Sequence, residues 1–61
     1  MRLCFAYEHR YRVVDDPVVR VTRDLNIIIT GIDPDKGEFR SFRVDRIGGL
    51  IRRVNLPRQA G

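Results

Sequence analysis

The chain has 61 residues, of which 43% are hydrophobic and 33% are charged, so it holds at most one domain and is a folded rather than a disordered protein. The single cysteine, Cys4, excludes an intrachain disulfide and favours a cytoplasmic protein, and no apolar run reaches the roughly 18 residues of a membrane span. The formal net charge is +4, and the excess lies after Asp45, because acids and bases balance up to that residue.

The first half of the chain predicts short strands separated by turns. Residues 2–7 (RLCFAY) alternate between two faces, and residues 11–14 continue the pattern after a break near His9. The segment 15–17 (DDP) then predicts a turn, because proline disfavours ladder pairing and aspartate favours turns. Residues 18–22 predict the next strand.

The middle of the chain predicts an antiparallel hairpin. Residues 25–32 (LNIIITGI) form the most apolar run, which predicts a central strand buried on both faces. Residues 33–38 (DPDKGE) predict a turn, with Pro34 at its second position and Gly37 at positive φ. Residues 39–47 are the predicted return strand.

The end of the chain predicts a bend, a last strand and a tail. The two glycines at 48–49 permit a sharp bend or a bulge, and residues 50–56 read as the last strand. A single domain is therefore predicted over 1–56, followed by a flexible tail over 57–61. The fold prediction is all-β: a small SH3 or Sm-like barrel of five to six antiparallel strands.

The segment GEFRSFRVDRI resembles the end of the WYL domain, a domain of many bacterial transcription regulators. The family pattern GxxRxFRxDRI is matched by Gly37, Arg40, Phe42, Arg43, Asp45, Arg46 and Ile47. The resemblance runs from about residue 2 to residue 54, and in this register the Trp-Tyr-Leu triplet of the family falls on three isoleucines, 27–29.

The resemblance implies an Sm-like barrel that binds a ligand, with nucleic acid as the expected class. It implies that the ligand surface is lined by Arg40, Arg43 and Arg46. Family members usually carry a helix-turn-helix domain as well, and this sequence holds none. A standalone domain would therefore bind nucleic acid itself, bind another protein, or be a fragment or a small regulator of bacterial or phage type.

The three motif arginines have two interpretations. They can contact phosphates, which arginine grips well, although a regular strand places Arg43 on the opposite face from Arg40 and Arg46. Alternatively, they pair with neighbouring carboxylates. The candidate partners are Glu38 or Glu8 for Arg40, and Asp45 or Asp33 for Arg46.

A second basic feature and two tyrosines extend the candidate site. Arg52 and Arg53 alternate in the last predicted strand, so one can face the ligand and the other water; a solvated chain end is the alternative interpretation. Tyr7 and Tyr11 are the candidates for stacking on bases, or else tyrosines at the barrel rim. The remaining residues of note, Phe5, Phe42 and Cys4, are predicted to lie in the core.

Nothing in the sequence predicts an enzyme, a metal site or a cofactor. One cysteine and one histidine are too few for a zinc site, and Ser41 is the only serine. The predicted function is a small non-catalytic regulatory protein that binds nucleic acid or a nucleotide-type anionic ligand, in transcription regulation. The alternative is a protein-interaction module that self-assembles or docks on a larger regulator or RNA polymerase.

Overall fold

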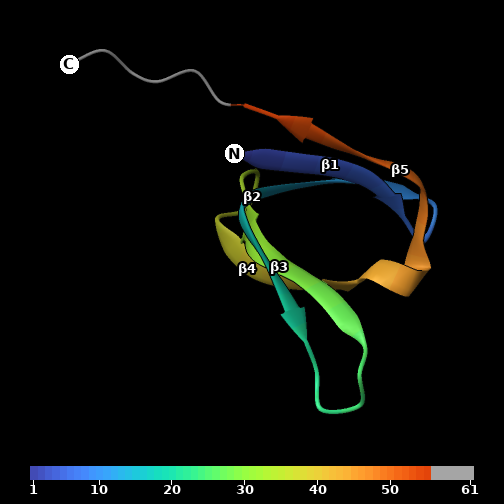
Figure 1. Cartoon of the computed structure of the whole chain (residues 1–61). Helices are drawn as coiled ribbons and strands as arrows, with labels where there is room; N and C mark the ends of the chain where they lie inside the picture. Colours follow the sequence, from blue (N-terminus) through green and yellow to red (C-terminus); the bar gives the residue numbers. More distant parts are fainter. Residues whose placement is uncertain (56–61) are drawn as a thin grey trace.

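The computed structural model describes residues 1–55, which form one antiparallel sheet of five strands in the order β4-β3-β2-β1-β5 (Figure 1). The elements are β1 (Arg2–Tyr7), β2 (Arg10–Val21), β3 (Ile27–Asp33), β4 (Glu38–Arg43), the 3-10 turn η1 (Val44–Arg46) and β5 (Ile47–Val54). The predicted all-β class is confirmed. Because no ladder joins β4 to β5 in the described residues, the sheet is open, and closure into a barrel is not shown. The predicted tail, 57–61, lies outside the described residues.

β1 and β2 form a hairpin through a two-residue turn. Tyr7 pairs with Arg10, and the residues between them, Glu8 and His9, have φ angles of 49° and 67°. Positive φ at both central positions is characteristic of a type I′ turn, whose twist matches the twist of the two paired strands. The break predicted near His9 is therefore confirmed as a hairpin turn.

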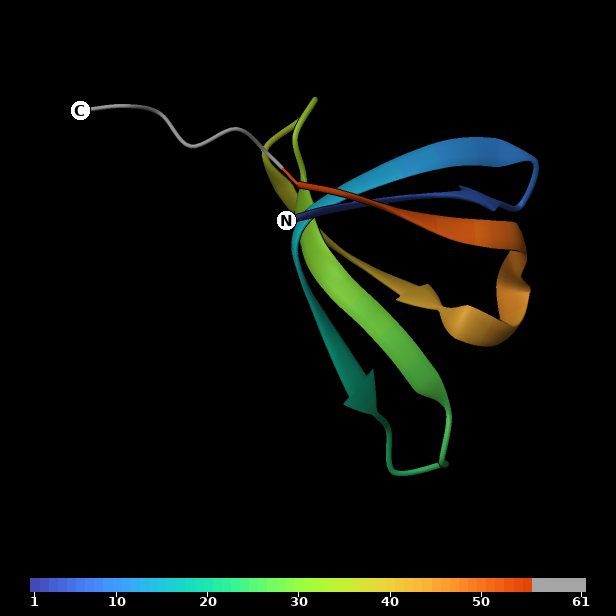
Figure 2. The same ribbon diagram turned by 45° about the horizontal axis from the view of Figure 1, so that its top comes forward.

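β2 is one bent strand of 12 residues rather than two strands. Its pairing with β3 shifts between Asp15 and Val18, and Asp16 has a φ of 52°. Pro17 has no N–H to offer the ladder, so the extra residues bulge and the strand bends without reversing. The turn predicted over 15–17 is wrong for this reason. The bend lets the first part of β2 pair with β1 and the second part with β3 (Figure 2).

Gly31 on β3 faces this bend at close range. A Cβ built on Gly31 would collide with Cγ1 of Val14 and would lie 2.7 Å from the backbone oxygen of Asp15. Close approach of the two strands, not an unusual φ, is therefore what requires glycine here.

β3 and β4 form the predicted hairpin. The Gly37 N–H donates to the Asp33 backbone oxygen at 2.7 Å, and Gly37 has a φ of 66°. The Asp35 N–H also donates to Asp33 Oδ1 at 2.9 Å, the local bond for which aspartate is favoured in turns. The predicted turn over 33–38 is confirmed.

The return strand is shorter than predicted. β4 ends at Arg43, and residues 44–46 form η1, so the predicted strand over 39–47 is wrong in its last part. β5 already begins at Ile47. The predicted bend at 48–49 is confirmed inside β5, where Gly49 has a φ of 75° and the pairing with β1 shifts between Cys4 and Ala6.

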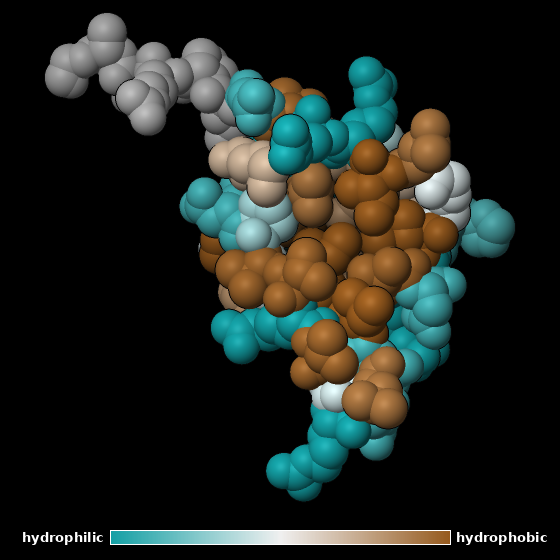
Figure 3. Space-filling view, viewed as in Figure 1, coloured by the Kyte–Doolittle hydropathy of each residue, from teal (hydrophilic) through white to brown (hydrophobic). Residues whose placement is uncertain are grey.

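The core is small and is centred on aromatic rings. Its buried residues are Phe5, Val14, Ile29 and Phe42, each no more than 5% exposed. The Phe5 and Phe42 rings meet edge-to-face with centroids 5.2 Å apart. Cys4 is buried too, so the predictions for Phe5, Phe42 and Cys4 are confirmed. Apolar surface remains visible over the middle of the face in Figure 3.

An ion pair ties the start of β1 to the bend of β2. Arg2 Nε and Nη2 donate to the two carboxylate oxygens of Asp15 at 2.6 and 3.0 Å. The hydrogen bond from Arg2 holds the pKa of Asp15 below its ordinary value of 3.8. Two parallel charge-assisted bonds of this kind also fix the geometry of the pair.

We expect this ion pair to make the free energy of unfolding depend on pH in the acidic range. A lowered folded-state pKa means that the pair contributes fully above the ordinary value of 3.8 and is lost as pH falls through the folded pKa. Asp15→Asn should therefore lower the free energy of unfolding near neutral pH, and the gap to the wild type should close once the pH falls below the folded-state pKa of Asp15. Urea unfolding of both proteins at several pH values measures the gap, and a gap independent of pH would contradict the role of the pair.

Candidate nucleic-acid interface

The first motif arginine, Arg40, is held by two carboxylates at the β3–β4 turn. Its Nε donates to Asp33 at 3.2 Å and its Nη2 donates to Glu38 at 3.3 Å. Partial burial acts to raise the pKa of Asp33, but hydrogen bonds from the Asp35 N–H and from Arg40 hold that pKa below its ordinary value. The predicted pairing of Arg40 with Glu38 is confirmed, and Asp33 joins it.

The other two motif arginines lie elsewhere and are also paired. Arg43 donates to Asp45 at 2.7 Å and to the Asn26 side chain at 3.1 Å. Arg46 on η1 donates to Glu8 at 3.4 Å, so its predicted pairing with Asp45 or Asp33 is wrong. The reason is that η1 ends the strand and turns Arg46 toward the β1–β2 hairpin.

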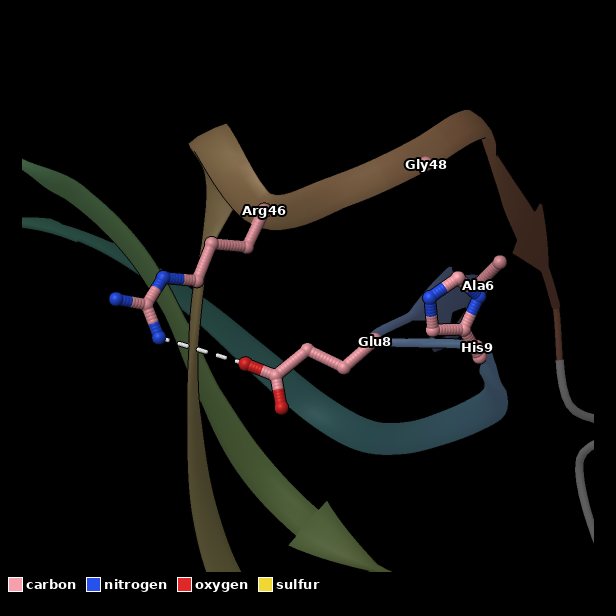
Figure 4. A pocket seen from close by; sticks show the side chains of 5 residues that line it. All are labelled: Ala6, Glu8, His9, Arg46 and Gly48. Atoms are coloured by element: carbon pink, nitrogen blue, oxygen red, sulfur yellow. Dashed lines mark hydrogen bonds and ion pairs between the residues drawn. The ribbon is translucent and has the colours of Figure 1, made fainter.

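A shallow cavity of about 310 Å³ lies between η1 and the β1–β2 turn. It is lined by Ala6, Glu8, His9, Arg46 and Gly48, and Figure 4 shows the Arg46 guanidinium reaching toward Glu8. Arg40 and Arg43 are not among the lining residues. The structure therefore does not gather the three motif arginines around this cavity, and the one that lines it already has an anionic partner.

The outer face of β5, β1 and β2 carries a different grouping. Arg52 on β5 lies across from Cys4 on β1, and Tyr11 on β2 lies across from Ala6, two residues further along β1. Tyr11 and Arg52 thus flank β1 on the same face. Hydrogen bonding with Cys4 raises the pKa of Tyr11, whereas the charge of Arg52 acts to lower it, as expected for neighbouring side chains.

Both partners of this grouping are available to a ligand. Tyr11 is 64% exposed. Arg52 and Arg53 are exposed, and no carboxylate of residues 1–55 forms an ion pair with either. Arg53 lies across from Leu3, so the predicted alternation of the two arginines between faces is confirmed.

Tyr7 occupies a different environment from Tyr11. Its ring packs edge-to-face on Phe42 with centroids 5.0 Å apart, and its hydroxyl accepts a hydrogen bond from the Arg43 N–H at 3.3 Å. Tyr7 therefore closes one side of the core, and only Tyr11 of the two predicted stacking residues presents an open ring.

Arg12 was missed by the sequence analysis. Its guanidinium carbon lies 5.8 Å from the centroid of the Phe42 ring, and its Nε is buried with no hydrogen-bond partner among residues 1–55. The alternation of the strand could have predicted this position, because Arg12 lies two residues before Val14 and so shares the face of β2 that builds the core. A cation over an aromatic face is stabilised, but an unsatisfied buried donor costs about 1–3 kcal/mol.

Comparisons with known proteins leave the family open. A scan against protein-family models, a search of curated proteins and a search of solved structures each found no match. Within residues 1–55, no three His, Cys, Asp or Glu side chains are grouped to hold a metal ion, and no helix is long and apolar enough to span a membrane. The resemblance to the WYL domain stays a prediction, and the chain is described by its fold: an all-β protein built on one antiparallel sheet.

Proposed function

We propose that the protein binds single-stranded nucleic acid, or a nucleotide-type anionic ligand, on the outer face of β5, β1 and β2. The observation that carries the proposal is that the exposed ring of Tyr11 shares a face with Arg52, which lies across β1 and has no ion pair within residues 1–55. A base stacks on the tyrosine while the guanidinium contacts a phosphate. Binding is non-catalytic and takes place in the cytoplasm.

The motif arginines contribute to this proposal as secondary contacts. Arg43 pairs with Asp45, and Arg46 pairs with Glu8. The side chains of these two carboxylates are exposed to solvent, at 59% and 60% respectively. Exposed ion pairs are worth only about 0–1 kcal/mol, so a phosphate can replace the carboxylate at little cost. The SH3 or Sm-like barrel and a role in transcription regulation belong to the same proposal, and both rest on the sequence pattern.

The test is fluorescence anisotropy with labelled single-stranded and double-stranded oligonucleotides and a labelled nucleotide, at low and physiological salt. Tyr11→Ala should weaken single-strand binding about tenfold, since stacking of one base is worth about 1–3 kcal/mol. Arg52→Ala should also weaken binding, because it removes a phosphate contact. Affinity should fall steeply as salt rises. The double variant Arg40→Ala/Arg46→Ala should weaken binding less than Arg52→Ala does.

The matched control is Arg20→Ala, which removes the same charge from an exposed arginine on β2 that also lacks an ion pair within residues 1–55. If Arg52→Ala and Arg20→Ala weaken binding equally, the arginines act only through net charge. Binding that is insensitive both to salt and to Tyr11→Ala would sink the proposal.

A second candidate function is a protein-interaction module that self-assembles or docks on a larger regulator or RNA polymerase. It is favoured by the exposure of large apolar side chains: Leu50 is 88% exposed, Leu25 82% and Phe39 66%. Apolar side chains that are exposed next to one another, as Val19, Val21 and Ile27 are on β2 and β3, are typical of a surface that binds a partner.

A further inference from the structure

The β2–β3 hairpin extends beyond the rest of the sheet, and the side of it that should face the core is uncovered (Figures 1 and 2). Val19 pairs with Ile29 and Val21 pairs with Ile27, so these four side chains share one face. Ile29 is 3% exposed in the core, whereas Val19 and Val21 are each 64% exposed and Ile27 is 48% exposed. The apolar face of the core therefore continues along the hairpin with no cover from residues 1–55, as the brown surface in Figure 3 illustrates.

The tip of the hairpin presents a further apolar side chain at a strained position. Leu25 is 82% exposed and has a φ of 64°, a region that favours glycine or asparagine. The turn is fixed by two backbone bonds: the Leu25 N–H donates to Thr22 at 2.9 Å, and the Thr22 N–H donates to Asn26 at 2.8 Å. A leucine is thus held outward where neither folding of the monomer nor turn geometry calls for one.

We propose that Val19, Val21, Leu25 and Ile27, here named the hairpin patch, form the interface of a two-fold dimer of this chain. The charges beside the patch select a second copy as the occupant. Arg23 and Asp24 lie next to Leu25, and neither has an ion pair within residues 1–55. A two-fold axis that passes between the two positions sets Arg23 of one copy against Asp24 of the other, and the reverse pair forms with it.

The size of the core supports the same occupant. In the part of the chain that the structure describes, only four residues form the buried cluster, and domains this short commonly gain stability by oligomerisation. The hairpin patch lies on the core side of β2 and β3. Tyr11 and Arg52 lie on the outer face of the sheet, where β2 and β5 pair with β1. The dimer therefore goes beyond the proposed nucleic-acid binding, and either proposal can fail alone.

The test is sedimentation velocity of the full chain over a concentration series. The wild type should dimerise, and Ile27→Asp should weaken the dimer at least tenfold. Val18→Asp is the matched control, because Val18 is also 48% exposed but lies on the opposite face of the hairpin. A wild type that stays monomeric throughout the series, or equal effects of the two variants, would overturn the proposal.

Two further variants separate a lost interface from a lost fold. Leu25→Gly relieves the positive φ, so it should raise the melting temperature of the dilute monomer while weakening the dimer. Reversing one charge, by Arg23→Asp or Asp24→Arg, should weaken the dimer, and the double reversal should restore it. A double variant as weak as the singles, or a Leu25→Gly dimer as tight as the wild type, would contradict the two-fold arrangement.

Discussion

Gly31→Ala is expected to remove a large part of the folding stability of the protein, at least about 3 kcal/mol. The added methyl would collide with the Val14 side chain, and it would also lie 2.7 Å from the backbone oxygen of Asp15, which cannot rotate away. Overpacking a core costs about 1–3 kcal/mol, and a clash with backbone belongs at or above the upper end of that range. At about 0.05–0.15 kcal/mol per residue, the total stability of a chain of 61 residues is about 3–9 kcal/mol, so this loss removes a third of it or more. Urea unfolding followed by circular dichroism measures the loss.

Two other glycines serve as controls for this prediction. Gly48→Ala meets no heavy atom of residues 1–55 within 4 Å and should be nearly neutral. Gly37→Ala also has open space, but its φ of 66° should make it cost about 1 kcal/mol. Gly31→Ala should be the most harmful of the three. If it costs no more than Gly37→Ala, β2 and β3 do not approach as closely as described.

Phe5→Ala should have a comparable effect, a loss of about 3–5 kcal/mol in the free energy of unfolding. Phe5 is 1% exposed, and its ring lies 5.2 Å from that of Phe42 and 6.4 Å from that of Tyr7, measured between centroids. Removing it leaves a cavity at the centre of a core with few other large side chains. The same denaturation experiment measures the loss.

Phe39→Ala is the control for the core prediction. It makes the same chemical change at a ring that is 66% exposed and lies across from Ile32 on the outer face. Surface substitutions of this kind usually change stability by less than about 0.5 kcal/mol. Equal losses for the two variants would mean that Phe5 is not the centre of the core.

Local patterns in the sequence predicted the hairpins better than the bends. The turn over 33–38 and the strand over 2–7 carry complete signals within a few residues, and both are confirmed. The segment 15–17 carries residues that serve a turn and a bulge equally well. Whether the chain reverses there depends on which strands lie on either side of β2, and that information is spread over the whole chain.

In the candidate site, too, local sequence patterns predicted some features, whereas others depend on the whole fold. Alternation predicted that Arg52 and Arg53 point to opposite faces, and the pairing of β5 with β1 confirms it. The neighbourhood of Tyr11 and Arg52 could not be predicted, because it depends on a register that shifts within β5. The ion pair of Arg46 with Glu8 was not predicted either, because η1 ends the strand and redirects the Arg46 side chain.

The order of the strands has a consequence for how the sheet assembles. β1 to β4 each pair with their neighbours in sequence, so those ladders form through short connections. β5 alone pairs with a strand from the other end of the chain, and this pairing bears a loop-closure entropy that grows with the logarithm of the loop length. β5 should thus dock last during folding and detach first in local opening. Because Arg52 travels with β5 while Tyr11 stays on β2, the surface that they share exists only while the two ends of the chain are joined.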